Sequence, residues 1–463
     1  MRPAVVTLAL FALALPAAAQ APDPRALERA IFKDIIEINT SDSAGNTRLV
    51  AEKLAARLEA AGFPQADIRI LGYEPKYQSL IVRYRGRPGG ARPIMLMAHM
   101  DVVDARREDW SFDPYQFREE AGYYYGRGTT DNKAGVATLV ANFIRLRQEG
   151  FRPDRDLIMV LTADEETSGE SIAWLMREHR DLIDAEYALN TDGGGGALVD
   201  GRATGFSVQT AEKIYLTFQF DVRNKGGHSS LPVPDNAIYR LAAGLGRLAA
   251  YQFPVRLNET TRAFFRRSAL SETGQTAADM KAVAESADPA AAARLSAASP
   301  YFNSVMRTTC VATRLLGGHA DNALPQLARA TVNCRILPDD SQDAVQAALT
   351  RVVADSEVEI TVAAPAKPSP PSPLRADVME PIEAIVKDMW PTATVVPEMS
   401  TGATDGLFVR NGGIPVYGVG AIFEDPNDIR AHGRDERILV DSFHQASLFW
   451  YRMLKALTGG PRT

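Results

Sequence analysis

Histidine and acidic side chains of the types that bind divalent metal ions recur along this sequence, from residue 99 to residue 432. Five of them form the candidate ligand set, namely His99, Asp131, Glu166, Asp192 and His432. Imidazole and carboxylate ligands without a thiolate suit a pair of zinc ions that share one carboxylate. Co²⁺ or Mn²⁺ can replace zinc in such a set.

Two further carboxylates lie next to these ligands in the sequence. Asp101 is placed to hold the second ring nitrogen of His99 in one tautomer, although it could instead cap a helix. Glu165 precedes Glu166 and must point elsewhere if Glu166 binds metal. A carboxylate beside a metal-bound water is suited to act as a general base.

The segments that precede these residues predict buried strands of a mostly parallel sheet. Apolar runs at 93–98, 157–161 and 187–192 each lead into or end in a histidine or an acidic residue. Helical segments at 136–146 and 171–179 alternate with them, which is the pattern of an α/β fold. Because ligands of such sheets bind beyond the carboxyl ends of the strands, we expect the polar side chains to converge there.

The length of 463 residues predicts two domains, one inserted into the other. Residues 22–211 form the first part of the α/β domain. Residues 212–363 follow the order strand–helix–strand–strand–helix–strand of a ferredoxin-like α+β domain, with exposed helices expected at 259–300. A Pro-rich linker follows, and residues 364–463 return to the α/β pattern.

The N-terminal sequence and the two cysteines indicate the cellular compartment in which the protein works. Residues 1–19 combine Arg2, an apolar run too short to span a membrane, and an A-x-A site ending at Ala19. We therefore expect a signal peptide, export to a bacterial periplasm, and no membrane association after cleavage. Cys310 and Cys334 would then form either one disulfide or two buried thiols.

Composition excludes other classes of protein. A hydrophobic content of 46% and a charged content of 23% are those of a soluble globular protein. The net charge of −6 and the lack of a Lys/Arg-rich run argue against a nucleic-acid partner. His179 and His444 lie on predicted helices, and we expect both to be solvated.

Seven short motifs keep a recognisable order. They are His99-Met-Asp101, Gly126-Arg-Gly-Thr-Thr-Asp131-Asn132-Lys133, Asp164-Glu165-Glu166, Asn190-Thr-Asp192, Gly226-Gly-His-Ser-Ser230, Asn322-Ala-Leu-Pro325, and Thr404-Asp405 with His432. Over residues 28–455 the chain resembles the co-catalytic zinc metallopeptidase family of carboxypeptidase G, carnosinase, aminoacylase and carboxypeptidase S. It is most similar to the carboxypeptidase S and N-acyl-amino-acid hydrolase branch.

The resemblance implies a role for each residue of the centre. His99, Asp131 and Asp192 would hold one zinc, and Asp131, Glu166 and His432 the other, with Asp131 bridging. Asp101 would orient His99. Glu165 would be the general base, and the Asp131–Asn132 peptide would be cis. The inserted domain would serve as a lid and dimerisation domain.

The resemblance also implies residues that act on the substrate. His228 would polarise the scissile carbonyl of a neighbouring subunit in a homodimer, although it could be a surface loop residue. Asn322 and Arg335 would contact the substrate, and Arg335 suits a free carboxylate unless it is only a cation at a strand end.

The expected function is hydrolysis of a peptide or amide bond in a small substrate with a free carboxylate, as in a carboxypeptidase or dipeptidase. A metal-bound water would attack, with Glu165 as general base. The alternative is an N-acyl-amino-acid deacylase of the aminoacylase type. A zinc-binding protein without catalysis would need no base at Glu165.

Overall fold

The computed structural model describes residues 23–43, 45, 47–363 and 365–459. The predicted signal peptide, residues 1–19, lies outside these residues. Within the described part of the chain, no helix combines the length and apolar character that crossing a membrane requires.

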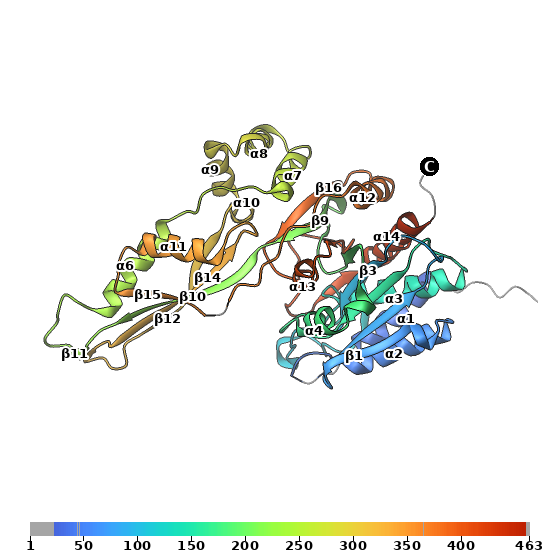
Figure 1. Ribbon diagram of the computed structural model, residues 1–463, viewed down its shortest axis with the longest axis horizontal. Coiled ribbons are helices and arrows are strands. Elements are labelled where there is room, and N and C mark those ends of the chain that lie inside the picture. Colours follow the sequence, from blue (N-terminus) through green and yellow to red (C-terminus); the bar gives the residue numbers. More distant parts are fainter. Residues whose placement is uncertain (1–22, 44, 46, 364, 460–463) are drawn as a thin grey trace, which may run out of the picture.

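A ten-stranded, mainly parallel sheet forms the larger part of the molecule, as expected (Figure 1). Its order is β1-β2-β6-β3-β7-β17-β9-β8-β18, and β16 pairs with β9. The strands are β1 Ile68–Glu74, β2 Tyr77–Tyr84, β3 Ile94–His99, β6 Leu157–Thr162, β7 Tyr187–Asn190, β8 Gly195–Val199, β9 Arg202–Glu212, β16 Thr394–Ser400, β17 Val416–Gly418 and β18 Phe423–Glu424. The central strand β3 runs parallel to β6 on one side and to β7 on the other.

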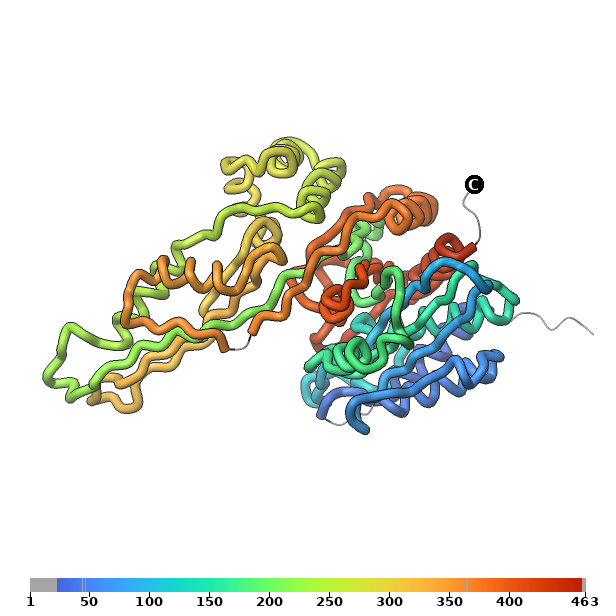
Figure 2. The backbone as a smooth tube through the Cα atoms, viewed as in Figure 1, coloured from blue at the N-terminus to red at the C-terminus, as the bar shows by residue number. Residues whose placement is uncertain are grey.

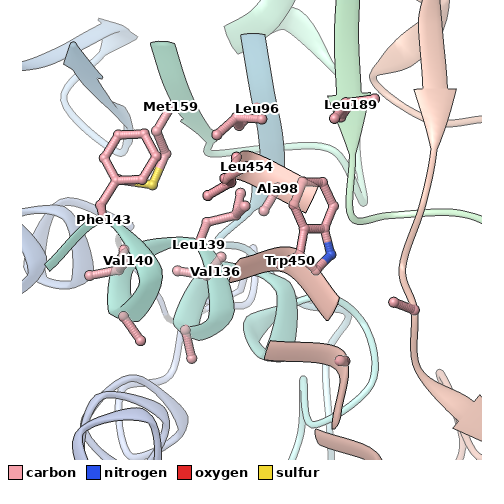
Figure 3. Packing of buried hydrophobic residues seen from close by; sticks show 14 of the residues in the cluster. Leu96, Ala98, Val136, Leu139, Val140, Phe143, Met159, Leu189, Trp450 and Leu454 are labelled. Atoms are coloured by element: carbon pink, nitrogen blue, oxygen red, sulfur yellow. The ribbon is translucent and has the colours of Figure 1, made fainter. Parts of the chain in front are cut away.

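Helices cover both faces of this sheet because alternate side chains of each buried strand point to opposite sides. On β3, Leu96 and Ala98 belong to one apolar cluster and Met97 to another. The first cluster includes residues of α1 Pro24–Ile36, α2 Thr47–Ala60, α3 Lys133–Gln148, α12 Ala376–Met389 and α14 Val440–Thr458; the second includes residues of α4 Glu170–Glu178, α5 Arg180–Ile183 and α13 Gly406–Asn411. Figure 3 shows α3 and Trp450 of α14 beneath β3.

One histidine prediction was wrong. His444 on α14 is buried, and its Nδ1 lies 2.5 Å from Oε2 of Glu28 on α1. Oε1 of the same carboxylate accepts a hydrogen bond from Ser447. A buried histidine with a carboxylate partner can be satisfied inside a core, so helical position alone did not decide its exposure.

A four-stranded antiparallel sheet of order β12-β14-β10-β15 forms the second part of the molecule. It consists of β10 Ile214–Arg223, β12 Thr309–Gly317, β14 Leu327–Ile336 and β15 Val358–Val362, and α6 Ala237–Ala250 and α11 Gln342–Val353 pack on it. The order of elements along the chain is that of the ferredoxin-like pattern. Figure 2 shows the chain entering this part through β10 and returning beside it near residue 365.

Cys310 and Cys334 form a disulfide that joins β12 to its neighbour β14. At the far end of this sheet, the short strands β11 Gly227–His228 and β13 Ala323–Leu324 pair to form a tip (Figure 1). The disulfide is one of the two states that the sequence left open for these cysteines.

The segment between β10 and β12 is helical, but it is not exposed throughout as expected. It contains α7 Glu259–Ser268, α8 Gly274–Ser286, α9 Pro289–Ala298 and α10 Pro300–Met306. These helices share an apolar cluster that also includes Ala211 and Met399 of the large sheet. The many alanines of the segment therefore belong partly to a helical core rather than to a solvated surface.

Candidate metal centre

Three parallel strands bring the candidate ligands to one edge of the large sheet. His99 is the last residue of β3, Glu165 and Glu166 follow β6, and Asp192 follows β7. Because β3 lies between β6 and β7, the ends of these strands are neighbours. The sheet topology therefore accounts for the convergence of residues that are far apart in sequence.

Asp131 reaches the same place from the start of α3. Its peptide bond to Asn132 is cis, as the resemblance implied. Lys133, the first residue of α3, is fully buried and donates hydrogen bonds to the backbone oxygens of Ile35 in α1 and of Ile38 just after it. Burial lowers the pKa of Lys133 to about 7. The start of α3 is thus fixed to α1 immediately after Asp131.

The carboxylate of Asp131 lies between the two histidines. Its Oδ1 is 2.8 Å from Nε2 of His99, and its Oδ2 is 3.1 Å from Nε2 of His432. Nε2 of His432 is also 3.0 Å from Oε1 of Glu166. Nε2 of His99 is 4.0 Å from Oδ2 of Asp192. One carboxylate with an oxygen directed to each histidine is the arrangement expected of a bridging ligand.

Two groups of three side chains offer ligand atoms within 4.8 Å of one another. One group is His99, Asp131 and Glu166, and the other is His99, Glu165 and Asp192. The expected ligands therefore come together, but Glu165, expected to be the base, also lies within ligand distance. The division of the ligands between two ions remains a prediction.

Asp101 contacts both His99 and the loop after β6. Nδ1 of His99 is 3.0 Å from the backbone oxygen of Asp101 and 3.5 Å from its carboxylate oxygen. The carboxylate accepts hydrogen bonds from the backbone N–H groups of Glu165 and Glu166. The nearer acceptor for the ring is thus the backbone oxygen of Asp101, while its side chain holds the loop that carries Glu165 and Glu166.

The raised pKa values of the cluster indicate that its carboxylates have too little positive charge around them to be ionised easily. Burial, together with the negative charge of Asp131, raises the pKa of Asp192 to about 8. Burial and the charge of Asp192 raise the pKa of Glu165 well above its usual value. Hydrogen bonds to Asp131 and Glu166 raise the pKa of His432 to about 10. Carboxylates crowded in a desolvated site are stabilised by divalent cations, so the donor set fits a metal centre.

A cavity of about 360 Å³ opens beside Glu165, between the two sheets. The start of β10 contributes Tyr215 and Thr217, whereas the side chains of Ile214 and Leu216 lie in the core of the second sheet. The C-terminal part contributes Leu407 and Phe408. Lys367 lies at its rim, with Nζ 4.7 Å from the centre of the Phe408 ring. The volume lies within the range of small-molecule sites.

Three predicted substrate residues lie outside the cluster. His228 and Asn322 are exposed at the tip of the second sheet, far from the centre of the same chain (Figure 1). Arg335 lies on β14 beside Tyr215, with the guanidinium 4.7 Å from the centre of the ring, and Tyr215 lines the cavity. Arg335 therefore lies close to the cavity, whereas His228 and Asn322 lie at the distant tip of the second sheet.

Sequence reasoning gave no role to Asp405. It is buried, lines the cavity near Glu165, and neither carboxylate oxygen has a hydrogen-bond partner among the described residues. Burial raises its pKa to about 7. Its position after Thr404 in a Gly-Ala-Thr-Asp loop was the available signal, but that pattern does not reveal an unpaired carboxyl group.

A mainly parallel α/β sheet with a cluster of histidines and carboxylates beyond the ends of its strands is an arrangement suited to a metallohydrolase. The profile of Peptidase family M20/M25/M40 matches residues 95–456. The chain belongs to this family, which confirms the family and the enzyme class expected from the motifs.

Relatives and solved structures agree with this assignment. The N-fatty-acyl-amino acid synthase/hydrolase PM20D1 of Xenopus tropicalis is 29% identical over 81% of this chain and 75% of its own length. The probable carboxypeptidase S-like 2 of Dictyostelium discoideum is 26% identical over 81% of this chain and 74% of its own.

The crystal structure of the M20 metallo-carboxypeptidase Sso-CP2 from Sulfolobus solfataricus has a TM-score of 0.69 at 17% identity, covering 93% of this chain and 99% of that one. The YXEP protein of Bacillus subtilis, described as a dinuclear metal binding peptidase, has a TM-score of 0.61 at 13% identity, covering 94% and 99%. These likenesses confirm the fold.

Proposed function

We propose that this enzyme hydrolyses the amide bond of N-acyl amino acids with apolar acyl groups. The observation that carries this proposal is the cavity beside Glu165, whose walls include the side chains of Tyr215, Leu407 and Phe408. An apolar group that leaves water for such a cavity gains about 25 cal/mol per Å² of buried surface. The PM20D1 relative, named for N-fatty-acyl amino acids, supports the same substrate class.

Arg335 supports recognition of a free carboxylate. Burial lowers the pKa of its guanidinium, and among the described residues it forms no ion pair. A partly desolvated guanidinium binds a carboxylate by strong, charge-assisted hydrogen bonds. A dipeptide also ends in a carboxylate, so Arg335 equally supports the second candidate, a carboxypeptidase or dipeptidase.

The centre is proposed to hold two zinc ions, one with His99, Asp131 and Asp192 and one with Asp131, Glu166 and His432. Bound zinc would polarise the carbonyl and make water more acidic. Glu165 accepts the proton of the attacking water and delivers it to the leaving nitrogen. Burial and the charge of the neighbouring Asp192 raise the pKa of Glu165 above its ordinary value.

A homodimer is the proposed assembly. Strand β11, which carries His228, pairs with β13 beside Asn322 at the end of the second sheet that points away from the large sheet (Figure 1). Strand β12 is an edge strand, and it exposes Val311, Leu315 and Leu316. Exposed apolar edge strands pair readily with another chain, and a second copy is the simplest occupant.

Export to a bacterial periplasm is proposed from the N-terminal sequence, with the disulfide as support. Disulfides persist in oxidising compartments and are rare in the cytosol. Expression of the full sequence in a Gram-negative host and mass measurement of the periplasmic product tests this. A mature chain that starts at Gln20 is expected, and a cytosolic chain that keeps residues 1–19 would refute it.

A substrate panel on the zinc-loaded enzyme tests the proposed reaction. We expect kcat/KM to rise from N-acetyl to N-dodecanoyl amino acids and to exceed that for dipeptides. Higher kcat/KM for dipeptides would favour the peptidase instead.

Glu165→Gln tests the role of the base. It should keep both ions and lower kcat by about 10²- to 10⁴-fold. The half-buried Glu170 on α4, changed to Gln, is the matched control and should keep full activity. Full activity of Glu165→Gln would refute the mechanism.

A further inference from the structure

Two loops that carry proposed metal ligands, residues 126–131 and 431–436, lie next to each other because the strands that adjoin them pair. The short strands β5 Tyr123–Tyr125 and β19 Arg437–Leu439 are antiparallel. The loop at 126–131 leaves β5 and ends at Asp131, and the loop at 431–436 carries His432 and enters β19. Pairing of the strands therefore places two distant parts of the sequence side by side.

The carboxylate of Glu436 is fully buried and binds the first of these loops through both oxygens. Oε1 accepts hydrogen bonds from the backbone N–H of Thr130 at 2.7 Å, its hydroxyl at 2.9 Å, and the backbone N–H of Asp131 at 3.2 Å. Oε2 accepts from the backbone N–H of Gly128 at 2.9 Å. Glu436 thus holds the backbone of Asp131 directly.

Arg127, which lies in the first loop, binds the backbone of the second loop. Its Nη1 donates to Oε2 of Glu436 at 2.7 Å, and its Nη2 donates to the backbone oxygens of His432 at 3.3 Å and Gly433 at 3.0 Å. The guanidinium also lies 5.1 Å from the centre of the Trp110 ring. Each loop therefore contributes one charged side chain that binds the backbone of the other.

The backbone of His432 needs such support. Its φ is 62°, in the left-handed region that a residue with a Cβ rarely adopts. The bond from Arg127 to the carbonyl of His432 holds the residue in that conformation. A buried ion pair adds little to stability compared with apolar residues of the same size. Its use here is better explained by the position that it gives to the neighbouring ligands.

We propose that Glu436 and Arg127 form a clamp that sets the separation between Asp131 and His432, and so determines binding of the ion between them. Neither side chain is a ligand, and both are positioning residues. The inference rests on the proposed two-metal centre. The ion held by His99 and Asp192 depends on the clamp only through Asp131, so the two ions should respond unequally to its loss.

The test is metal binding by Glu436→Gln, measured with Co²⁺ by calorimetry and by the visible absorption of the bound ion. Glutamine has the same size, but its NH₂ group faces donors instead of accepting from them. We expect one ion to bind as in the wild type and the second to bind about 10- to 100-fold more weakly, with an altered absorption spectrum. Arg127→Lys, which keeps the charge but loses the two-sided geometry, should give the same pattern.

The matched control is Glu28→Gln, because Glu28 is also a buried carboxylate of this domain and touches neither loop. It should lower the unfolding midpoint without changing either Co²⁺ affinity. If Glu436→Gln and Arg127→Lys bind Co²⁺ at both sites with wild-type affinity, the clamp is overturned. It is also overturned if Glu28→Gln weakens Co²⁺ binding as much as these two variants do. If the wild type binds no Co²⁺, the proposed centre itself fails.

Discussion

Mixed dimers provide the sharpest test of how the exposed tip takes part in the reaction. If His228 serves the centre of the partner, a dimer of one Glu165→Gln chain and one His228→Ala chain contains one complete site. That site combines Glu165 of the His228→Ala chain with the histidine of the other chain. The second site of the same dimer lacks both groups.

The local structure of the tip indicates the chemistry that His228 would supply to a partner's centre. The backbone N–H of Ser230 donates to Nδ1 of His228 at 3.1 Å. In the neutral ring the proton then lies on Nε2, which is the donor needed to stabilise a developing oxyanion. Removing one such donor costs about 10²- to 10³-fold in kcat, and removing a general base costs about 10²- to 10⁴-fold.

The expected activities follow from these factors. Each homodimeric variant should keep at most about 1% of the wild-type rate, whereas the mixed dimer should keep about half, because one of its two sites is complete. The assay needs co-expression with two different affinity tags, purification over both, and measurement of kcat on the best N-acyl substrate.

A crossed control uses the same two substitutions placed in one chain. Paired with a wild-type chain, the doubly substituted chain leaves no complete site if His228 acts across the dimer. If His228 acted within its own chain, the wild-type chain would keep its site and the result would reverse. Half activity in the crossed control, with none in the first mixed dimer, would refute the reasoning.

Two further predictions concern stability. The 24-residue separation of Cys310 and Cys334 gives a loop-closure contribution of about 3.5 kcal/mol in the chain-entropy model, so Cys310→Ala/Cys334→Ala should unfold at clearly lower urea than the oxidised wild type. Equal unfolding midpoints for the wild type with and without reductant would contradict this. Burial raises the pKa of Asp34, but hydrogen bonds from Arg57 and Lys53 outweigh it and hold this pKa below its ordinary value. Its stabilisation is therefore present above the unfolded-state pKa and lost as pH falls through the lower folded-state pKa. The stability gap between wild type and Asp34→Asn, measured by urea unfolding, should be constant above about pH 5 and narrow steadily below about pH 4; a gap that does not narrow below about pH 4 would refute the assignment.

The strands that carry the centre could be predicted from sequence because their signal is local. Each consists of a short apolar run followed by a polar residue, and β3 and β6 need no distant information to be recognised. The helical segment at 259–306 shows the limit of this approach. Its alanines indicated helices, but their burial depends on contacts with Ala211 and Met399, which no local pattern encodes.

The position of a ligand also depends on residues that carry no metal-binding signal. In the sequence, Glu436 is an acid two residues before an apolar pair, and Arg127 is one cation in a Gly-rich loop. Their partnership exists only because β5 and β19 pair across more than three hundred residues. Ligand identity can thus be inferred from residue type and order, whereas the distance between Asp131 and His432 is a property of the folded chain. A metal site therefore needs both the ligands and the backbone contacts that hold them in place.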